Sequence, residues 1–136
     1  MNATLLYRIA AVLFVLFAAG HTIGFLKFTP PTPEGVAVYD SMKSVQFNLD
    51  GRSYSYGRFY LGFGLYISVY MLFSALLAWH LGNMAMLNPG AFGIIGWAFC
   101  AVQVLGFALS CVYFAPITAV LSGAVAICLG IAAWLK

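Results

Sequence analysis

A lone histidine inside an apolar run is the residue best placed to do chemistry in this chain. His21 lies in the stretch from Ile9 to Leu26, which contains no Asp, Glu, Lys or Arg. Ionisable groups at membrane depth are costly and usually face a bundle interior, a partner or a cavity. A functional interpretation makes His21 a proton acceptor, a ligand-binding group or a haem ligand. The structural interpretation is a neutral imidazole that bonds a neighbouring helix.

Gln103 is the second polar side chain in such a position, in the middle of the third apolar stretch. Its amide must be satisfied, and a bond to His21 or to a backbone carbonyl would fix the register of two helices. A polar pocket is expected if the two side chains converge.

The richest polar and aromatic stretch runs from Asp50 to Tyr60. Its charged side chains can pair with one another or bind an anionic head group. One interpretation is an ordinary aromatic belt with flanking arginines; the other is a lipid or quinone-like pocket roofed by this segment. The candidate ligand-binding residues are therefore His21, Gln103, Asp50, Arg52, Tyr54 and Arg58.

The cysteines and histidines do not form a metal-binding pattern. Cys100, Cys111 and Cys128 lie in apolar stretches without a C-x-x-C pair, which is typical of small packing residues. His21 and His80 are expected near opposite faces of the membrane, too far apart to hold a haem between them. We predict no metal site, no cofactor and no catalytic residue.

The charges exclude several classes of protein. A net charge of +3 that is spread along the chain lacks the clustered basic surface of nucleic-acid binding. All three acids, Glu34, Asp40 and Asp50, lie in one polar segment. A proton-coupled exporter with a carboxylate in its first span and an isomerase with a buried acid are therefore excluded, as is a disulfide-forming oxidoreductase with loop cysteine pairs.

The composition predicts an integral membrane protein. Hydrophobic residues make up 64% of the chain and charged residues 7%, whereas soluble domains carry about 25% charged residues. Four apolar stretches are long enough to cross the bilayer, at approximately 5–26, 60–81, 91–113 and 116–135. The first is longer than a typical signal-peptide core and is predicted to be retained. The predicted fold is an all-α, single-domain four-helix membrane bundle over 1–136.

Local signals set the predicted limits of these spans. Gly82–Asn83 is expected to end the second span, and Asn88–Pro89 to supply the N-cap and first residue of the third. The turn at Ala115–Pro116 is so short that the last two spans must form an antiparallel hairpin.

One structured loop, 27–59, is expected between the first two spans. Spacings of three and four residues from Val38 to Leu49 predict a short amphipathic helix at about 36–49. Asp50–Gly51 is expected to form a turn. This loop has more Lys and Arg residues than the terminal side, and the positive-inside rule therefore favours a cytoplasmic loop. The cations compared are Lys27, Lys43, Arg52 and Arg58 in the loop, against Arg8 and Lys136.

Small residues four positions apart occur in every span, and they predict close helix packing. The pairs are Gly20 and Gly24, Gly64 and Ser68, Gly96 and Cys100, Gly106 and Ser110, and Ser122 and Ala126.

Four segments resemble a group of small, uncharacterised four-span bacterial membrane proteins. They are Gly20–Phe25, Met42–Val45, Phe59–Gly64 and Tyr113–Pro116. The resemblance implies a bacterial inner membrane and brings no established activity. In span number and size alone, the chain is also similar to the DoxX-like four-helix proteins.

Two functional hypotheses remain open. The leading one is a non-enzymatic multi-pass protein that binds a lipid or another hydrophobic ligand, or that serves as a subunit of a homo-oligomer or larger membrane complex. The alternative is an intramembrane enzyme or proton-coupled transporter that uses His21, with Asp50, Arg52 or Tyr54 closing over it.

Overall fold

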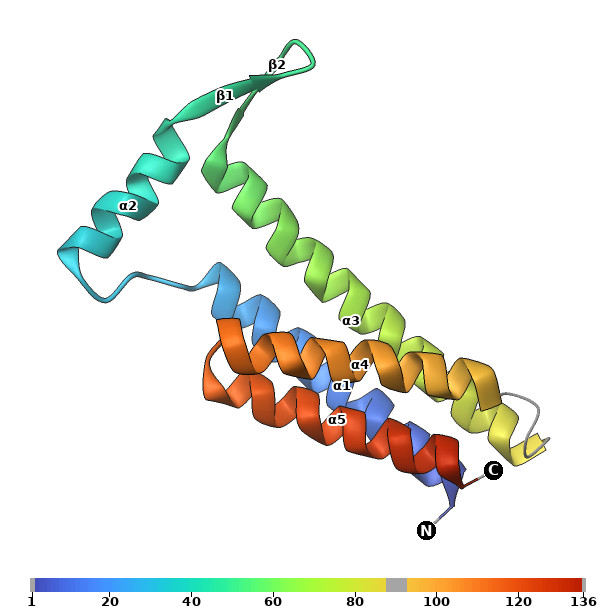
Figure 1. The fold of residues 1–136 in the computed structure, drawn as a ribbon. Coiled ribbons are helices and arrows are strands. Elements are labelled where there is room, and N and C mark those ends of the chain that lie inside the picture. The colour runs from blue at the N-terminus through green and yellow to red at the C-terminus, as the bar shows by residue number, and fades with distance from the viewer. Residues whose placement is uncertain (1, 88–92, 136) are drawn as a thin grey trace. The chain divides into compact units, whose positions relative to one another are not determined.

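The structure, a computed structural model, describes residues 2–87 and 93–135. In these ranges the elements are α1 (Ala3–Leu26), α2 (Pro33–Ser44), β1 (Gln46–Leu49), β2 (Arg52–Ser55), α3 (Tyr56–Leu87), α4 (Gly93–Tyr113) and α5 (Pro116–Trp134) (Figure 1). Helices α1, α3, α4 and α5 are long and apolar enough to cross a membrane. The predicted all-α membrane bundle with a structured loop is confirmed, and the chain is a multi-pass membrane protein.

The chain divides into two compact units. The helix unit comprises Met1–Phe17 and Met71–Lys136, and the loop unit comprises Ala18–Tyr70. The boundary between the units falls inside α1 and inside α3, so each of these helices contributes one segment to each unit. This division does not test the predicted single domain, which stays a prediction.

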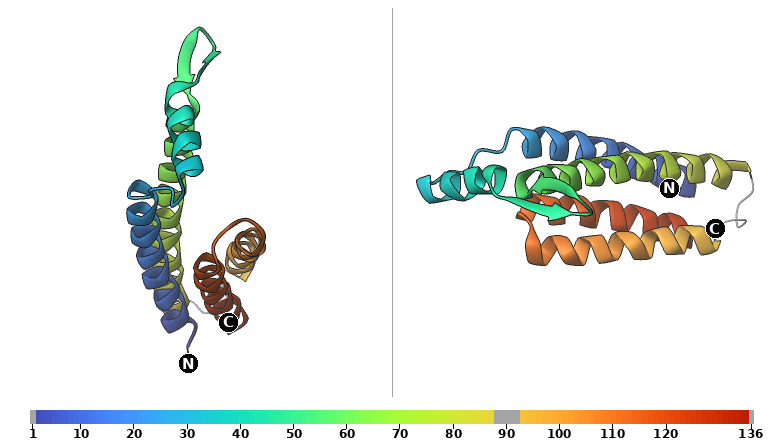
Figure 2. Two further views of the ribbon diagram at one scale, coloured as in Figure 1. Left: turned by 90° about the vertical axis from the view of Figure 1, so that its left-hand side faces the viewer. Right: turned by 90° about the horizontal axis from the view of Figure 1, so that it is seen from above.

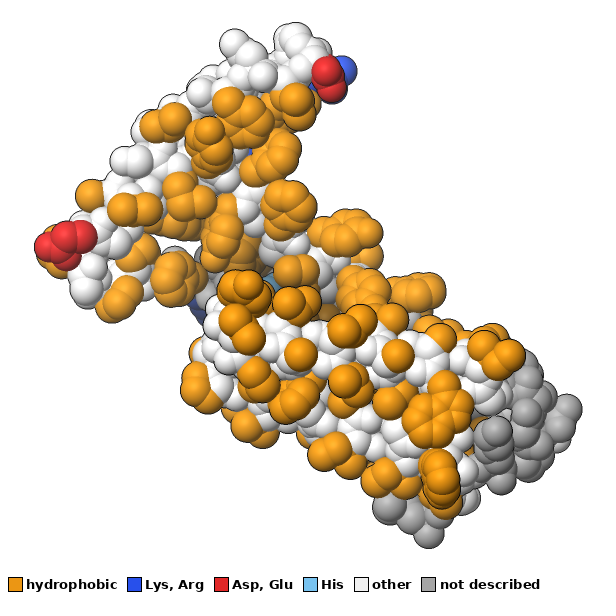
Figure 3. Space-filling model, in the orientation of Figure 1, with side chains coloured by type: hydrophobic (Ala, Val, Ile, Leu, Met, Phe, Trp, Pro, Cys, Tyr) orange, Lys and Arg blue, Asp and Glu red, His pale blue; other side chains and the backbone are white. Residues whose placement is uncertain are grey.

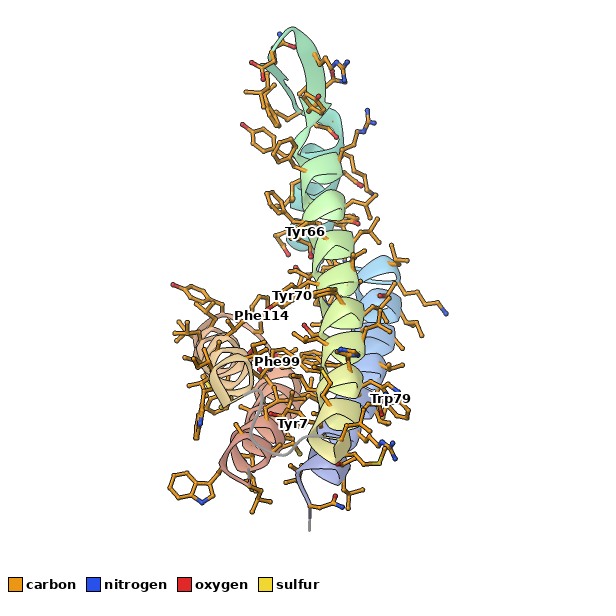
Figure 4. All side chains as sticks on the ribbon, turned by 90° about the vertical axis from the view of Figure 1, so that its right-hand side faces the viewer. Tyr7, Tyr66, Tyr70, Trp79, Phe99 and Phe114 are labelled. Atoms are coloured by element: carbon orange, nitrogen blue, oxygen red, sulfur yellow. The ribbon has the colours of Figure 1, made fainter. Side chains whose placement is uncertain are left out.

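The core of the helix unit draws on all four long helices. Phe14 of α1 stacks on Phe99 of α4, with ring centroids 5.7 Å apart. Figure 4 shows Tyr7 and Phe99 between the helices and Trp79 on the outer side of α3. The buried cluster consists of Leu6, Tyr7, Ala10, Ala11, Phe14, Ala75, Ala78, Leu81, Phe99, Cys100, Val125, Leu129 and Ala132. Many of these side chains are small, as expected where lipid gives no hydrophobic drive for association and packing must be close.

Helices α4 and α5 form the predicted antiparallel hairpin and lie side by side (Figure 2). Ala115 is extended, with φ −63° and ψ 149°, and Pro116 begins α5. Small residues form the seam between the two helices. A Cβ added at Gly96 would lie 3.4 Å from the Ala133 Cβ, and one at Gly130 would lie 3.3 Å from the Cys100 sulfur.

Helix α3 is longer than predicted, because Gly82–Asn83 does not end it. The helix continues to Leu87. Gly82 is buried, and a Cβ added there would lie 3.2 Å from the Tyr7 Cβ and 3.3 Å from the Thr4 carbonyl oxygen. This glycine therefore permits close contact with α1 instead of stopping a helix. The predicted cap at Asn88–Pro89 lies outside the described residues.

The loop unit contains a helix followed by a β-hairpin, where one helix was predicted at about 36–49. Helix α2 begins at Pro33 because the Thr32 hydroxyl accepts a hydrogen bond from the Gly35 amide, 3.1 Å away. It ends at Ser44, after which apolar and polar residues alternate along β1. Val45 to Leu49 therefore follows the period of a strand, and the prediction of a continuous helix was wrong.

The Asp50–Gly51 turn is confirmed, and it joins β1 to β2 in an antiparallel pair. Both residues have positive φ, 50° and 75°, which is the backbone of a tight hairpin turn. The register pairs Phe47 with Tyr54 and Leu49 with Arg52.

Of the two small-residue pairs in the loop unit, one lies at a helix contact and the other does not. Gly64 and Ser68 are buried and face α1. By contrast, a Cβ added at Gly20 or Gly24 meets nothing within 4 Å among the described residues. Inside this unit, α1 contacts α3 through His21, Thr22 and Phe25 instead.

Candidate functional site

His21 bonds the neighbouring helix. Its Nε2 lies 3.1 Å from the carbonyl oxygen of Gly64 on α3. A carbonyl oxygen only accepts, so Nε2 carries the proton and donates it. The imidazole also stacks on Phe25, with centroids 5.7 Å apart. This arrangement corresponds to the structural interpretation of His21.

Two further contacts continue this α1–α3 seam. The Thr22 and Ser68 hydroxyl oxygens lie 2.8 Å apart and share a hydrogen bond. The Phe25 ring fills the space left by Gly64, where an added Cβ would overlap it. Phe25 also contacts Tyr60, with ring centroids 5.0 Å apart. The seam thus leads from His21 to the end of α1, where the loop begins.

Gln103 has its partner within the helix unit. Its Nε2 donates to the Ser122 hydroxyl, 2.8 Å away, and approaches the Ser122 carbonyl oxygen at 3.3 Å. Gln103 therefore joins α4 to α5. Because His21 belongs to the loop unit and Gln103 to the helix unit, their convergence in one pocket stays a prediction.

The β-hairpin has one aromatic face and one polar face. Side chains alternate along a strand, so the Phe47–Tyr54 pair lies on one face and the Gln46–Ser55 pair on the other. The aromatic face packs on the start of α3, since Phe59 lies 5.2 Å from Phe47 and 5.9 Å from Tyr54 between centroids.

The hairpin does not bring its charged residues to His21. Asp50 is in the turn and Arg52 directly follows it; both are exposed. His21 contacts α3 at Gly64, about 12 Å along the helix from its first residue. The hairpin extends beyond that first residue (Figure 1). Within the loop unit, Asp50 and Arg52 therefore lie away from His21, and the alternative hypothesis stays a prediction.

A pocket of about 420 Å³ lies on the polar side of the hairpin. Its apolar lining comes from the end of α1 and the first turns of α3, and its polar lining comes from α2, the hairpin and the first turn of α3. It is lined by Phe25, Leu26, Tyr39, Lys43, Gln46, Ser53, Ser55, Gly57, Arg58, Tyr60 and Leu61. We call it the loop pocket. Of the predicted site residues, Arg58 lines it.

An aromatic groove of about 470 Å³ lies on the other side of the same helix start. Arg58 lines this groove too, together with the predicted residue Tyr54. Its other lining residues are Phe59, Gly62, Phe63 and Tyr66. Arg58 is thus the side chain shared by the two hollows.

Lys43 and Gly57 line the loop pocket, but they were not predicted as site residues from the sequence. A Cβ added at Gly57 would lie 3.2 Å from the Met42 carbonyl oxygen and 3.3 Å from the Lys43 Cα. The absent side chain therefore lets the end of α2 lie against the start of α3, and this places Lys43 on the pocket that Arg58 lines. No sequence spacing signals this contact, because the thirteen residues between Lys43 and Gly57 include the whole hairpin.

Arg8 was counted in the sequence only as a cation of the terminal side, and it forms a contact of its own in the helix unit. Its guanidinium carbon lies 5.2 Å from the centre of the Trp79 ring, and its Nη2 lies 3.4 Å from the Asn83 side-chain oxygen. It therefore ties α1 to α3 near their terminal-side ends.

Within residues 2–87 and 93–135, no three His, Cys, Asp or Glu side chains gather as a metal site would require. No family model, curated protein or solved structure matches the chain. The resemblance to small four-span bacterial proteins stays a prediction.

Proposed function

We propose that this chain is a membrane protein of the bacterial inner membrane that binds one amphiphilic, lipid-like ligand in the loop pocket. The single observation that carries the proposal is the make-up of this pocket. One part of its lining is apolar and continuous with two membrane helices; the other part is polar and comes from the hairpin and α2. Such a division fits a molecule with a polar head and an apolar tail.

The depth of the pocket supports this assignment. Helix α3 has 32 residues and is about 48 Å long, whereas the hydrocarbon core is about 30 Å thick. A helix of this length must therefore extend beyond the hydrocarbon core. The pocket is lined by the first turns of α3, from Gly57 to Leu61, and by the last turn of α1. These turns belong at the level of the lipid head groups.

The size of the loop pocket also fits a lipid-like ligand. Ligand sites commonly measure about 300–1,000 Å³, and the loop pocket measures about 420 Å³. This volume suits a head group and the first part of an acyl chain. The rest of the chain would extend into the bilayer along α1 and α3.

Native mass spectrometry of the full chain, purified in a mild detergent, tests the proposal. We expect one bound species of lipid mass on the wild-type protein. Leu61→Trp, which fills the pocket, should lower the bound fraction severalfold. Leu65→Trp is the matched control: Leu65 lies one turn further along α3, is 40% exposed where Leu61 is 43% exposed, and does not line the pocket.

Two results would count against the proposal: wild-type protein without any bound lipid, or equal occupancy in the two tryptophan variants. A second protein in the same spectra would instead favour the other half of the leading hypothesis, a subunit of a membrane complex.

A further inference from the structure

We infer that the ligand of the loop pocket is a phospholipid with a net negative charge, whose phosphate is held between Lys43 and Arg58. This inference rests on the proposed function and adds the charge of the ligand to it. Two cationic side chains from different elements line one hollow. None of its eleven lining residues is acidic.

Lys43 is held at the pocket by its own helix and by α3. The contact of α2 with Gly57 fixes the backbone of Lys43 beside the first turn of α3. Its ammonium lies 4.2 Å from the centre of the Tyr39 ring and 3.4 Å from an Asp40 carboxylate oxygen. Asp40 is not among the residues that line the pocket. Both partners of this ion pair are well exposed, and such pairs are weak. A phosphate can therefore compete for Lys43.

Arg58 enters from the first turn of α3. Its backbone amide donates to the Ser55 hydroxyl, 3.2 Å away, which caps the helix. The planar guanidinium suits bidentate binding of a phosphate. The start of a long helix also carries a partial positive charge that favours an anion.

The polar face of the hairpin supplies neutral hydrogen-bonding groups. The Ser53 hydroxyl donates to the Gln46 side-chain oxygen at 2.5 Å, and the Gln46 amide carries two N–H donors. Both residues line the pocket. Hydroxyl and amide groups around two cations are suited to phosphate oxygens and glycerol hydroxyls.

The apolar part of the lining distinguishes a lipid from a soluble phosphate as the ligand. Phe25, Leu26 and Leu61 line the same hollow as Lys43 and Arg58. A soluble phosphate would leave this surface unused, whereas an acyl chain would cover it. We therefore assign the site to a membrane phospholipid.

Native mass spectrometry of the full chain, titrated with phosphatidylglycerol or with phosphatidylcholine of the same acyl chains, tests the inference. We expect the wild type to prefer the anionic lipid by roughly fivefold or more, since one surface cation contributes about fivefold in affinity. The double variant Lys43→Gln/Arg58→Gln should lose the preference. The control Lys27→Gln/Arg52→Gln removes the same net charge from two loop residues that do not line the pocket and should keep it.

Four results would overturn the inference. Equal wild-type affinity for the two lipids would remove the charge preference while leaving the proposed function intact. Equal losses in both double variants would assign the preference to general surface charge. Displacement of phosphatidylglycerol by millimolar glycerol phosphate would make the ligand a soluble phosphate. Failure of either lipid to bind the wild type would overturn the proposed function as well.

Discussion

At the scale of single residues, two polar side chains within the membrane spans, His21 and Gln103, form hydrogen bonds between helices. His21 bonds the Gly64 carbonyl across α1 and α3, and Gln103 bonds Ser122 across α4 and α5. Each hydrogen bond satisfies a polar side chain that would be costly to leave unpaired in hydrocarbon. Each also fixes a register that apolar side chains, which are similar to lipid, specify poorly.

The hydrogen bonds between Gln103 and Ser122 are expected to contribute measurably to stability. Gln103→Leu should lower the free energy of unfolding by about 0.6–1.7 kcal/mol, the range of interhelical hydrogen bonds in membranes. Unfolding in dodecyl sulfate, followed by far-UV circular dichroism, measures it. In a double-mutant cycle, Ser122→Ala should cost little more once Gln103 is replaced. Additive losses would show that the two side chains act independently.

Gly64 is required for a close approach in the loop unit, and Gly62 is not. An added Cβ at position 64 would overlap the Phe25 ring, while one at position 62 meets nothing within 4 Å among the described residues. Gly64→Ala should therefore lower the free energy of unfolding by about 1–3 kcal/mol, and Gly62→Ala should not lower it.

The same denaturation assay shows whether overlap with the Phe25 ring, and not another effect, causes the loss of stability in Gly64→Ala. If the Phe25 ring is the obstacle, Phe25→Ala should cost much less in the Gly64→Ala background than in the wild type. Equal costs in the two backgrounds would contradict this explanation.

The residues of the candidate site were only partly predictable from the sequence. Arg58, which lines the loop pocket, could be singled out because charge is rare in this composition. His21 and Gln103 could be singled out for their polarity, but they join helices instead. Lys43 and Gly57 could not, because their importance depends on the contact between α2 and α3. Asp50 and Arg52 have the right chemistry, but the hairpin carries them to its turn.

At the scale of elements, the four long helices were predictable and the loop was not. Four apolar runs dominate the sequence, and a helix satisfies every backbone group in lipid. The segment 45–49 is too short for its period to be read securely, and Val45 and Leu49 fit a helix as well as a strand. Gly82 was misinterpreted for a different reason. In the sequence alone, a glycine that permits close packing inside a helix cannot be distinguished from a glycine that ends one.

The hairpin depends on its turn. Gly51 has φ 75°, where alanine costs about 1–2 kcal/mol. Gly51→Ala should therefore raise the hydrogen-exchange rates of the amides in β1 and β2 by roughly 5- to 30-fold. Asp50→Asn should leave them unchanged, because asparagine tolerates positive φ. Unchanged exchange in Gly51→Ala would show that contacts with α3, not the turn, hold the strands.

At the scale of the whole molecule, membrane topology follows from the four spans. An even number of spans places both ends of the chain on one side and the loop 27–59 on the other. Four Lys and Arg residues in that loop, against two on the terminal side, favour a cytoplasmic loop. This orientation would expose the loop pocket to the cytoplasmic leaflet, whose surface potential is negative.

Single cysteines labelled with a membrane-impermeant maleimide test this arrangement. After Cys100, Cys111 and Cys128 are replaced by alanine, a cysteine at Glu34 should react only in inverted membrane vesicles, and one at Asn2 only in intact cells with a permeable outer membrane. Both positions are exposed, so burial cannot explain a missing signal. If both react from one side, the four-span topology is wrong. If the two patterns are exchanged, the topology stands but the loop is outside, and the pocket must take its lipid from the outer leaflet.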